Sequence, residues 1–143
     1  MVTKIASILK HSGSELPSVR PDTTAYEAVA MMATKGIAAV LVMDEGRLRG
    51  IFSSKDYGSR VVLRGENGKE VLVRDVMTSP IVTVPSNATV SECIQIMTDK
   101  SFRHLPVFEN GELVGMVTLA DLVRHQLAGK KFEIEQLMQY IGG

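Results

Sequence analysis

One stretch of sequence that occurs twice decides the fold. Residues 18–56 read SVRPDTTAYEAVAMMATKGIAAVLVMDEGRLRGIFSSKD, and residues 83–121 read TVPSNATVSECIQIMTDKSFRHLPVFENGELVGMVTLAD. The copies align without a gap at a constant offset, so that Ser18 stands opposite Thr83 and Asp56 opposite Asp121. A repeat of this length indicates two similar structural units, and we expect one compact body built from two halves.

Each copy begins with an extended piece followed by a helix. The extended pieces are expected around 18–20 and 81–84. The pairs Thr24–Glu27 and Thr89–Glu92 fit capping boxes, in which both side chains bond to backbone N–H groups at a helix start. Apolar residues at helical spacing then predict helices with one face turned to a core. These residues are Ala25, Ala28, Val29 and Met32 in the first copy, and Val90, Cys93, Ile94 and Met97 in the second.

A pair of strands and a second helix complete each copy. Apolar runs at 39–43 and 48–52 flank a turn, and the second copy carries Asn-Gly between its runs, a strong hairpin signal. Helices are expected to begin at Ser54 and Leu119. Each unit is therefore predicted to be β-α-β-β-α, an α/β (α+β) fold in which the two repeats pack as a pseudo-two-fold pair.

The repeats set the predicted boundaries. The first repeat covers 3–64, a polar, glycine-rich linker covers 65–70, the second repeat covers 71–127, and a helical tail covers 128–143. Apolar residues in this tail are too many to leave in water, so we expect it to dock on the body or on a second chain. They are Phe132, Leu137, Tyr140 and Ile141.

Composition excludes several classes of protein. The 143 residues carry a formal net charge of zero and are 45% hydrophobic, enough to bury a core. A neutral chain with few aromatic residues is not typical of nucleic-acid binding, and no apolar run approaches the ~20 residues that span a bilayer. From these two observations, neither a nucleic acid nor a membrane is predicted as a partner. We also find no secretory signal.

The cysteine is read as structural, and the histidines are not read as metal ligands. Cys93 is the single cysteine, which fits a reducing, cytoplasmic location, and its place on an apolar helix face predicts a buried core residue. None of the histidines has metal-ligand spacing to another ligand, so no metal site is expected.

A paired motif carries a family resemblance. Residues 50–56 and 115–121 both read Gly, two apolar strand residues, Ser or Thr, two spacers and Asp, and Arg103-His104-Leu105-Pro106-Val107 precedes the second copy. This closely resembles a tandem pair of cystathionine-β-synthase (CBS) domains, a Bateman module, of the small stand-alone kind, over residues 3–127. The resemblance implies an adenosine ligand between the repeats: AMP, ADP, ATP, S-adenosylmethionine or NAD.

The motif residues suit such a ligand. Ser53 and Thr118 stand where a strand gives way to a helix, where free backbone N–H groups and the helix dipole favour a phosphate. Asp56 and Asp121 follow three residues later, where a carboxylate can accept both ribose hydroxyls. The alternative is that Ser53–Asp56 and Thr118–Asp121 are only capping boxes, and both readings can hold at once.

The two clefts are expected to differ. Arg103 and His104 can donate to phosphate oxygens, whereas the aligned Ala38 and Ala39 cannot, although Arg103 and His104 could also be a surface salt-bridging pair. The predicted stronger cleft comprises Arg103, His104, Thr118 and Asp121, with an adenine wall from Ser12, Gly13, Pro17, Ile37 and Ala38 beside His11. The weaker cleft comprises Ser53 and Asp56, with an adenine wall of Thr78, Val82 and Phe102. Its positive charge would come from Lys55, Arg60 and Arg64. The alternative is that this basic helical face is simply solvated.

We therefore predict an adenosine-nucleotide-binding sensor or regulatory module (AMP, ADP or ATP, with NAD possible) without catalysis. No Walker loop, no G-x-G-x-x-G after a strand and no nucleophile motif is present. The alternative is a structural dimerisation or partner-regulating protein with vestigial clefts. A third reading, an enzyme that acts on a nucleotide through His104, is held as the weakest. The expected partners are the nucleotide, a second copy in a homodimer, and an unidentified regulated protein.

Overall fold

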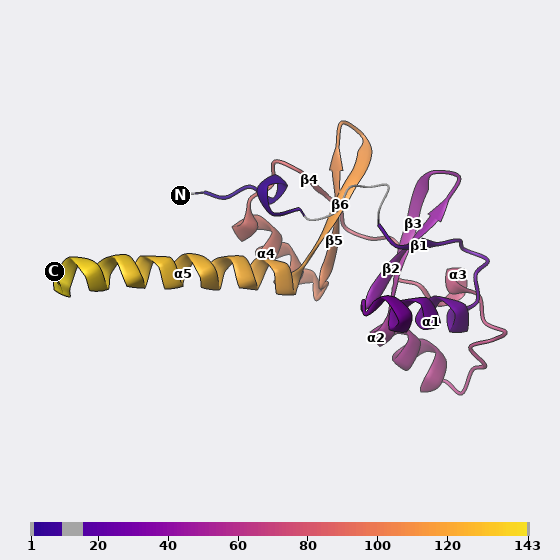
Figure 1. Ribbon diagram of the computed structural model, residues 1–143. Coiled ribbons are helices and arrows are strands. Elements are labelled where there is room, and N and C mark those ends of the chain that lie inside the picture. Colours follow the sequence, from indigo (N-terminus) through magenta and orange to yellow (C-terminus); the bar gives the residue numbers. More distant parts are fainter. Residues whose placement is uncertain (1, 10–15, 143) are drawn as a thin grey trace. The chain divides into compact units, whose positions relative to one another are not determined.

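The chain folds into two compact units, which we describe separately (Figure 1). The computed structural model describes residues 2–9 and 16–142. Unit 2 comprises Glu15–Val82, and unit 1 comprises Met1–Ser14 together with Thr83–Gly143. Each unit holds one three-stranded sheet and its helices.

Unit 2 contains the first repeat. Its sheet has the order β1-β2-β3, with β1 parallel to β2 and β2 antiparallel to β3. Its elements are β1 (Ser18–Val19), α1 (Ala25–Lys35), β2 (Ala39–Asp44), β3 (Arg47–Ser53), α2 (Ser54–Tyr57), a π-helical turn η3 (Gly58–Val62) and α3 (Val73–Val76).

Unit 1 repeats this arrangement. Its sheet has the order β4-β5-β6 with the same strand directions, and the ladders match: Val42 faces Gly50 in one unit, and Val107 faces Gly115 in the other. The predicted α+β class, the β-α-β-β-α order and the C-terminal helix are confirmed. Its elements are a 3-10 helix η1 (Ile5–Ile8), β4 (Val84–Pro85), α4 (Val90–Lys100), β5 (His104–Glu109), β6 (Glu112–Thr118) and α5 (Leu119–Gly142).

The hairpins close in two-residue turns. Glu45 and Gly46 have φ of 49° and 77°, and Asn110 and Gly111 have φ of 52° and 79°. Positive φ at both central residues is the type I′ turn, whose twist matches that of the flanking strands. The turn fixes the register of each hairpin, and thereby the place where β3 and β6 end.

Hydroxyl caps start α1 of unit 2 and α4 of unit 1. The Thr24 hydroxyl accepts from the Glu27 N–H at 3.2 Å, and the Thr89 hydroxyl accepts from the Glu92 N–H at 3.0 Å. This half of the predicted capping boxes is confirmed. The other half differs at Glu92, whose carboxylate accepts from the Thr89 hydroxyl instead of from a backbone N–H.

A short segment from outside the continuous repeat completes each unit. In unit 1 the Ile5 N–H donates to the Ala88 carbonyl at 2.8 Å, and in unit 2 the Val73 N–H donates to the Thr23 carbonyl at 2.8 Å. These bonds are equivalent, because Ala88 and Thr23 are related by the repeat. The compact units therefore group residues differently from the sequence boundaries 3–64 and 71–127.

Apolar packing between sheet and helix forms each core. In unit 2, Val40 and Phe52 of the sheet pack with Met32 of α1, and all three are almost fully buried. In unit 1 Cys93 of α4 is fully buried, as predicted. Burial, reinforced by the neighbouring Glu92 carboxylate, raises the pKa of the Cys93 thiol to about 11. The thiol is therefore protonated at neutral pH and acts as a small core side chain.

Helix α5 departs from the expected separate tail. It runs unbroken from Leu119 to Gly142 through Gly129, where an added Cβ would meet nothing within 4 Å. Its C-terminal half does not dock on the body: Phe132, Leu137 and Tyr140 are 61%, 60% and 87% exposed. One isolated glycine costs a helix only about 1 kcal/mol, which is too little to end it.

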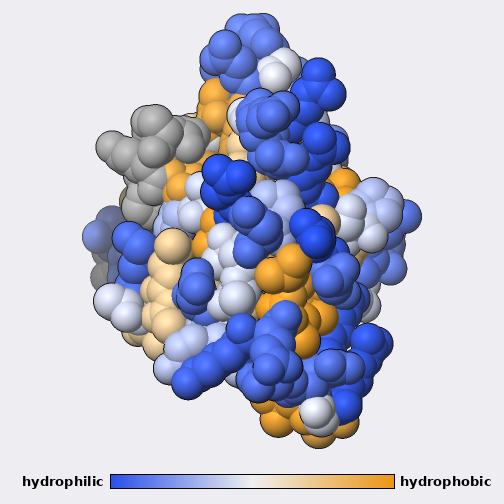
Figure 2. All heavy atoms as spheres, turned by 90° about the vertical axis from the view of Figure 1, so that its right-hand side faces the viewer, coloured by the Kyte–Doolittle hydropathy of each residue, from blue (hydrophilic) through white to orange (hydrophobic). Residues whose placement is uncertain are grey.

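The face drawn in Figure 2 is mostly hydrophilic, with hydrophobic patches among the hydrophilic residues. The large apolar side chains that unit 2 leaves exposed include Tyr26, Val62 and Leu63. Scattered apolar residues of this kind are normal on a soluble surface and indicate no site.

Gly50 permits a close backbone approach that the site depends on. A Cβ at this position would lie 2.7 Å from the Thr78 carbonyl oxygen and 2.7 Å from the Met77 Sδ. We predict that Gly50→Ala lowers the free energy of unfolding by about 1 to 3 kcal/mol in urea titrations. Gly58→Ala is the matched control, because a Cβ there meets nothing within 4 Å in a right-handed helical conformation. Equal stability of the two variants would contradict this account.

Candidate functional site

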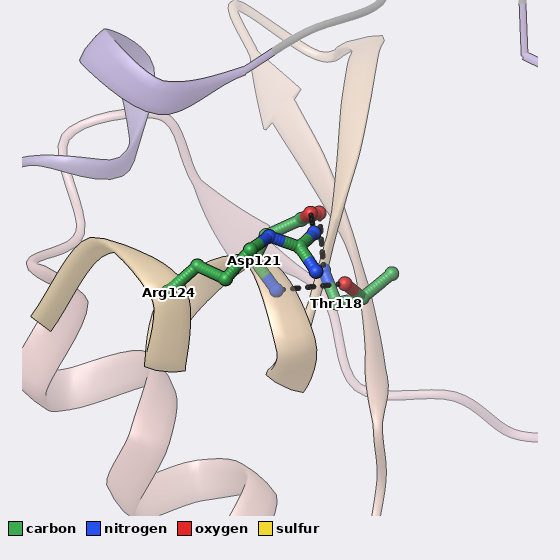
Figure 3. Close-up of polar contacts among 3 residues, drawn as sticks. All are labelled: Thr118, Asp121 and Arg124. Atoms are coloured by element: carbon green, nitrogen blue, oxygen red, sulfur yellow. Dashed lines mark hydrogen bonds and ion pairs between the residues drawn. The ribbon is translucent and has the colours of Figure 1, made fainter. Parts of the chain in front are cut away.

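The turn from β6 into α5 holds two of the predicted site residues (Figure 3). The Thr118 N–H donates to Asp121 Oδ2 at 3.3 Å, and the Asp121 N–H donates to the Thr118 hydroxyl oxygen at 3.1 Å. This reciprocal pair is a capping box with Asp in place of Glu. The capping interpretation is thus confirmed, and it fixes the Asp121 carboxylate at the helix start.

Arg124 adds a charge to this turn. Its Nη2 lies 2.6 Å from Asp121 Oδ1, with the Arg124 side chain 63% exposed and that of Asp121 20% exposed. Figure 3 shows the guanidinium folded back from the first turns of α5 onto the carboxylate. Our sequence reasoning missed Arg124, although an Asp and an Arg three residues apart on a helix are close enough to pair.

The start of β5 lies beside this turn. His104 is paired in register with Thr118, and the Arg103 carbonyl accepts the Leu119 N–H at 2.9 Å. Arg103 is exposed and His104 is half-buried. Unit 1 therefore brings together four residues of the predicted stronger cleft: Arg103, His104, Thr118 and Asp121.

Unit 2 builds the equivalent turn between β3 and α2. The Ser53 N–H donates to Asp56 Oδ2 at 3.0 Å, and the Asp56 N–H donates to the Ser53 hydroxyl oxygen at 3.1 Å. Asp56 is 8% exposed. The hydroxyl of Thr78, a residue that the sequence analysis assigned to an adenine wall, donates to Asp56 Oδ1 at 3.2 Å. Asp56 is thus bound by neutral donors, whereas Asp121 is bound by a cation.

Free backbone N–H groups were expected at both turns. This expectation is wrong for the last residue of each strand and the first residue of each helix, whose N–H groups are bonded. The Ser53 and Thr118 N–H groups are bonded to carboxylates, and the Ser54 N–H donates to the Ala38 carbonyl at 2.9 Å. A strand-type bond continues one residue into each helix, and the hydroxyl caps take the N–H groups of Asp56 and Asp121. These backbone N–H groups are therefore already bonded within the fold.

The basic residues predicted for unit 2 fare differently. Lys55 is exposed. Arg60 is committed to structure, because its Nη1 donates to the carbonyls of Val76 and Met77 at 3.1 and 2.6 Å. Arg60 thus holds the end of α3 in place, and the suggestion that it supplies phosphate charge is not supported.

The remaining predicted residues lie apart from these turns or outside the described residues. The Pro17 carbonyl accepts the Leu41 N–H at 3.1 Å, and Ile37 packs against the core of unit 2. Ser12 and Gly13, with His11, lie outside the described residues. Ala38 is exposed, and Val82 and Phe102 are half-buried. Both predicted clefts draw residues from both units.

No metal site is found in the part of the chain that the structure describes, where no three acidic, histidine or cysteine side chains gather suitably. No helix among the described residues is long and apolar enough to cross a membrane.

Comparison with known proteins identifies the family of the chain. The model of the CBS domain matches residues 6–57 and 73–128. The chain belongs to the CBS domain family. Among curated proteins, CBSX3 of Arabidopsis thaliana, a mitochondrial CBS domain-containing protein, is 31% identical over 150 residues, covering 99% of this chain and 73% of the relative. The cytoplasmic location predicted from Cys93 thus stays a prediction.

Solved structures share the fold. A CBS-domain protein from Burkholderia ambifaria MC40-6 is 35% identical, with a TM-score of 0.83 over 88% of this chain and 95% of that one. CBSX2, crystallised in complex with AMP, is 24% identical with a TM-score of 0.72 over 90% of this chain and 98% of that one. At that identity the likeness to CBSX2 concerns the fold.

The hydroxyl of Thr78 should contribute measurably to stability. Thr78→Val removes one donor from the buried Asp56 carboxylate, and we expect the free energy of unfolding in urea to fall by about 1 kcal/mol. Thr78→Ser keeps the hydroxyl and should retain most of that stability. A Val variant as stable as the Ser variant would show that the bond contributes nothing.

Proposed function

We propose that this protein is a regulatory module that binds an adenosine nucleotide and has no catalytic role of its own. The ligand class is AMP, ADP or ATP, with NAD as a further candidate. Membership of the CBS domain family supports a regulatory module, and the charged turn of unit 1 supports the choice of an anionic ligand.

The observation that carries the proposal is the set of side chains around the Thr118–Asp121 cap. The Asp121 carboxylate is held at the helix start by the Thr118 N–H, and a carboxylate is a group that can accept both hydroxyls of a ribose diol. Arg103 and His104 stand beside Thr118 at the start of β5, and both can donate to phosphate oxygens. A carboxylate next to two potential phosphate donors suits a nucleotide better than it suits a purely apolar ligand.

We propose that the second repeat supplies the phosphate contacts of the tighter site. The ladder aligns His104 with Thr118 in unit 1 and Ala39 with Ser53 in unit 2, so the repeats differ here in side chain and not in backbone. An alanine cannot donate to a phosphate. The adenine contacts, and the place of the ligand between the repeats, remain part of the proposal.

A second candidate function is the binding of another protein chain through α5, with a second copy or a regulated protein as the occupant. Leu127, Ile134 and Met138 of this helix are 61%, 59% and 68% exposed. Exposed apolar residues of this size at helical spacing favour an interaction. This candidate is compatible with nucleotide binding.

Thermal unfolding with AMP, ADP, ATP and NAD tests the proposed ligand class. A ligand at about 100 times its Kd should stabilise the folded protein by about 2.7 kcal/mol, which raises the Tm. Asp121→Asn removes a charged acceptor, so we expect its affinity to fall roughly ten- to hundredfold in calorimetric titrations.

The matched control is Asp22→Asn. Asp22 is an exposed carboxylate paired with Arg20 at 3.3 Å, and its loss changes the net charge by the same amount. This variant should bind as the wild type does. If none of the four nucleotides raises the Tm of the wild-type protein, the proposal is wrong.

A further inference from the structure

We propose that Arg124 selects phosphorylated over unphosphorylated adenosine ligands at the Thr118–Asp121 site. It does so by cancelling the negative charge of Asp121. This inference rests on the proposed function and names the residue that sets which ligand of that class is preferred.

The first step is the charge that a nucleotide meets. A carboxylate that accepts ribose hydroxyls lies within a few ångströms of the phosphate on the same ribose, and two negative groups at that distance repel each other. An unphosphorylated nucleoside pays no such cost. A lone aspartate at the ribose position therefore favours adenosine relative to AMP.

Arg124 removes this penalty. Its Nη2 is 2.6 Å from Asp121 Oδ1, so the pair is close to neutral as seen by a third charge. The bond uses one of the five guanidinium N–H groups, and a carboxylate can accept hydrogen bonds from several donors at once. Arg124 thus changes the electrostatic potential at the site without occupying all the acceptor positions that a ribose needs.

The first repeat provides the natural comparison. Ser59 stands at the position that the repeat relates to Arg124, and its hydroxyl donates to the Lys55 carbonyl at 2.9 Å. The Asp56 carboxylate accepts from Thr78 and from the Ser53 N–H, which are both neutral. Equivalent carboxylates in one chain therefore differ in charge compensation, and Arg124 supplies a positive charge at Asp121 that Ser59 cannot supply at Asp56.

The test compares AMP with adenosine by isothermal titration calorimetry. The readout is the ratio of the adenosine Kd to the AMP Kd, which a general loss of stability would not shift. We expect Arg124→Gln to lower this ratio by about three- to tenfold, by weakening AMP and sparing adenosine, as expected for one partly screened unit charge. Arg124→Lys keeps the charge and should stay near the wild-type ratio.

Arg20→Gln is the matched control. Arg20 forms a similar exposed ion pair with Asp22 in unit 2, so its loss changes the net charge equally and should leave the ratio unchanged. Thermal unfolding of each ligand-free variant checks that it is folded.

Two outcomes would overturn the inference and leave the proposed function standing. One is an unchanged ratio in Arg124→Gln. The other is tighter binding of both compounds by Arg124→Gln, which would mean that Arg124 competes with the ribose for Asp121. If the wild-type protein binds neither adenosine nor any of the four nucleotides, the proposed function is wrong, and this inference falls with it.

Discussion

Each unit passes from its last strand into the helix that follows it at a residue whose hydroxyl and backbone N–H are both bonded to an aspartate three positions later. At Ser53–Asp56 and Thr118–Asp121 this exchange ends the strand, starts the helix and fixes one carboxylate at the junction. The hairpin turns fix where the strands end, and Gly50 admits the segment that reaches Asp56. The geometry of both candidate sites depends on these two caps.

The caps also explain how one backbone can hold two different sites. The strand register is the same in both units, so the differences lie in the side chains around each carboxylate. Asp56 is buried and meets the Thr78 hydroxyl, whereas Asp121 is more exposed and meets the Arg124 guanidinium. A duplicated fold can in this way keep its stabilising bonds in both copies while the preference for a ligand diverges.

Much of the fold was predictable because the repeat aligns residues with structural roles. The hairpins, the caps at Thr24 and Thr89 and the buried face that includes Cys93 all follow from local pattern. The pairing of Ile5 with unit 1 and of Val73 with unit 2 was missed, because it rests on backbone bonds between distant segments. Apolar residues at matching spacing, Ile5 and Ile8 against Val73 and Val76, were the available signal.

The site was predicted less completely than the fold. The motif located Asp56 and Asp121, but their partners Thr78 and Arg124 became visible only in three dimensions, as did the commitment of Arg60 to backbone carbonyls. Side-chain partners depend on rotamers and on packing that a linear pattern does not encode. The continuation of α5 through Gly129 was also not predicted, because a glycine alone does not show whether a helix ends.

The central claim is that the capping carboxylate of unit 1 also binds ribose. A crystal structure of the protein grown with AMP tests it most directly. The account predicts ribose hydroxyls within hydrogen-bonding distance of Asp121 and the phosphate on the side of Arg103 and His104. AMP bound elsewhere, with no ribose hydroxyl bonded to Asp121, would contradict it.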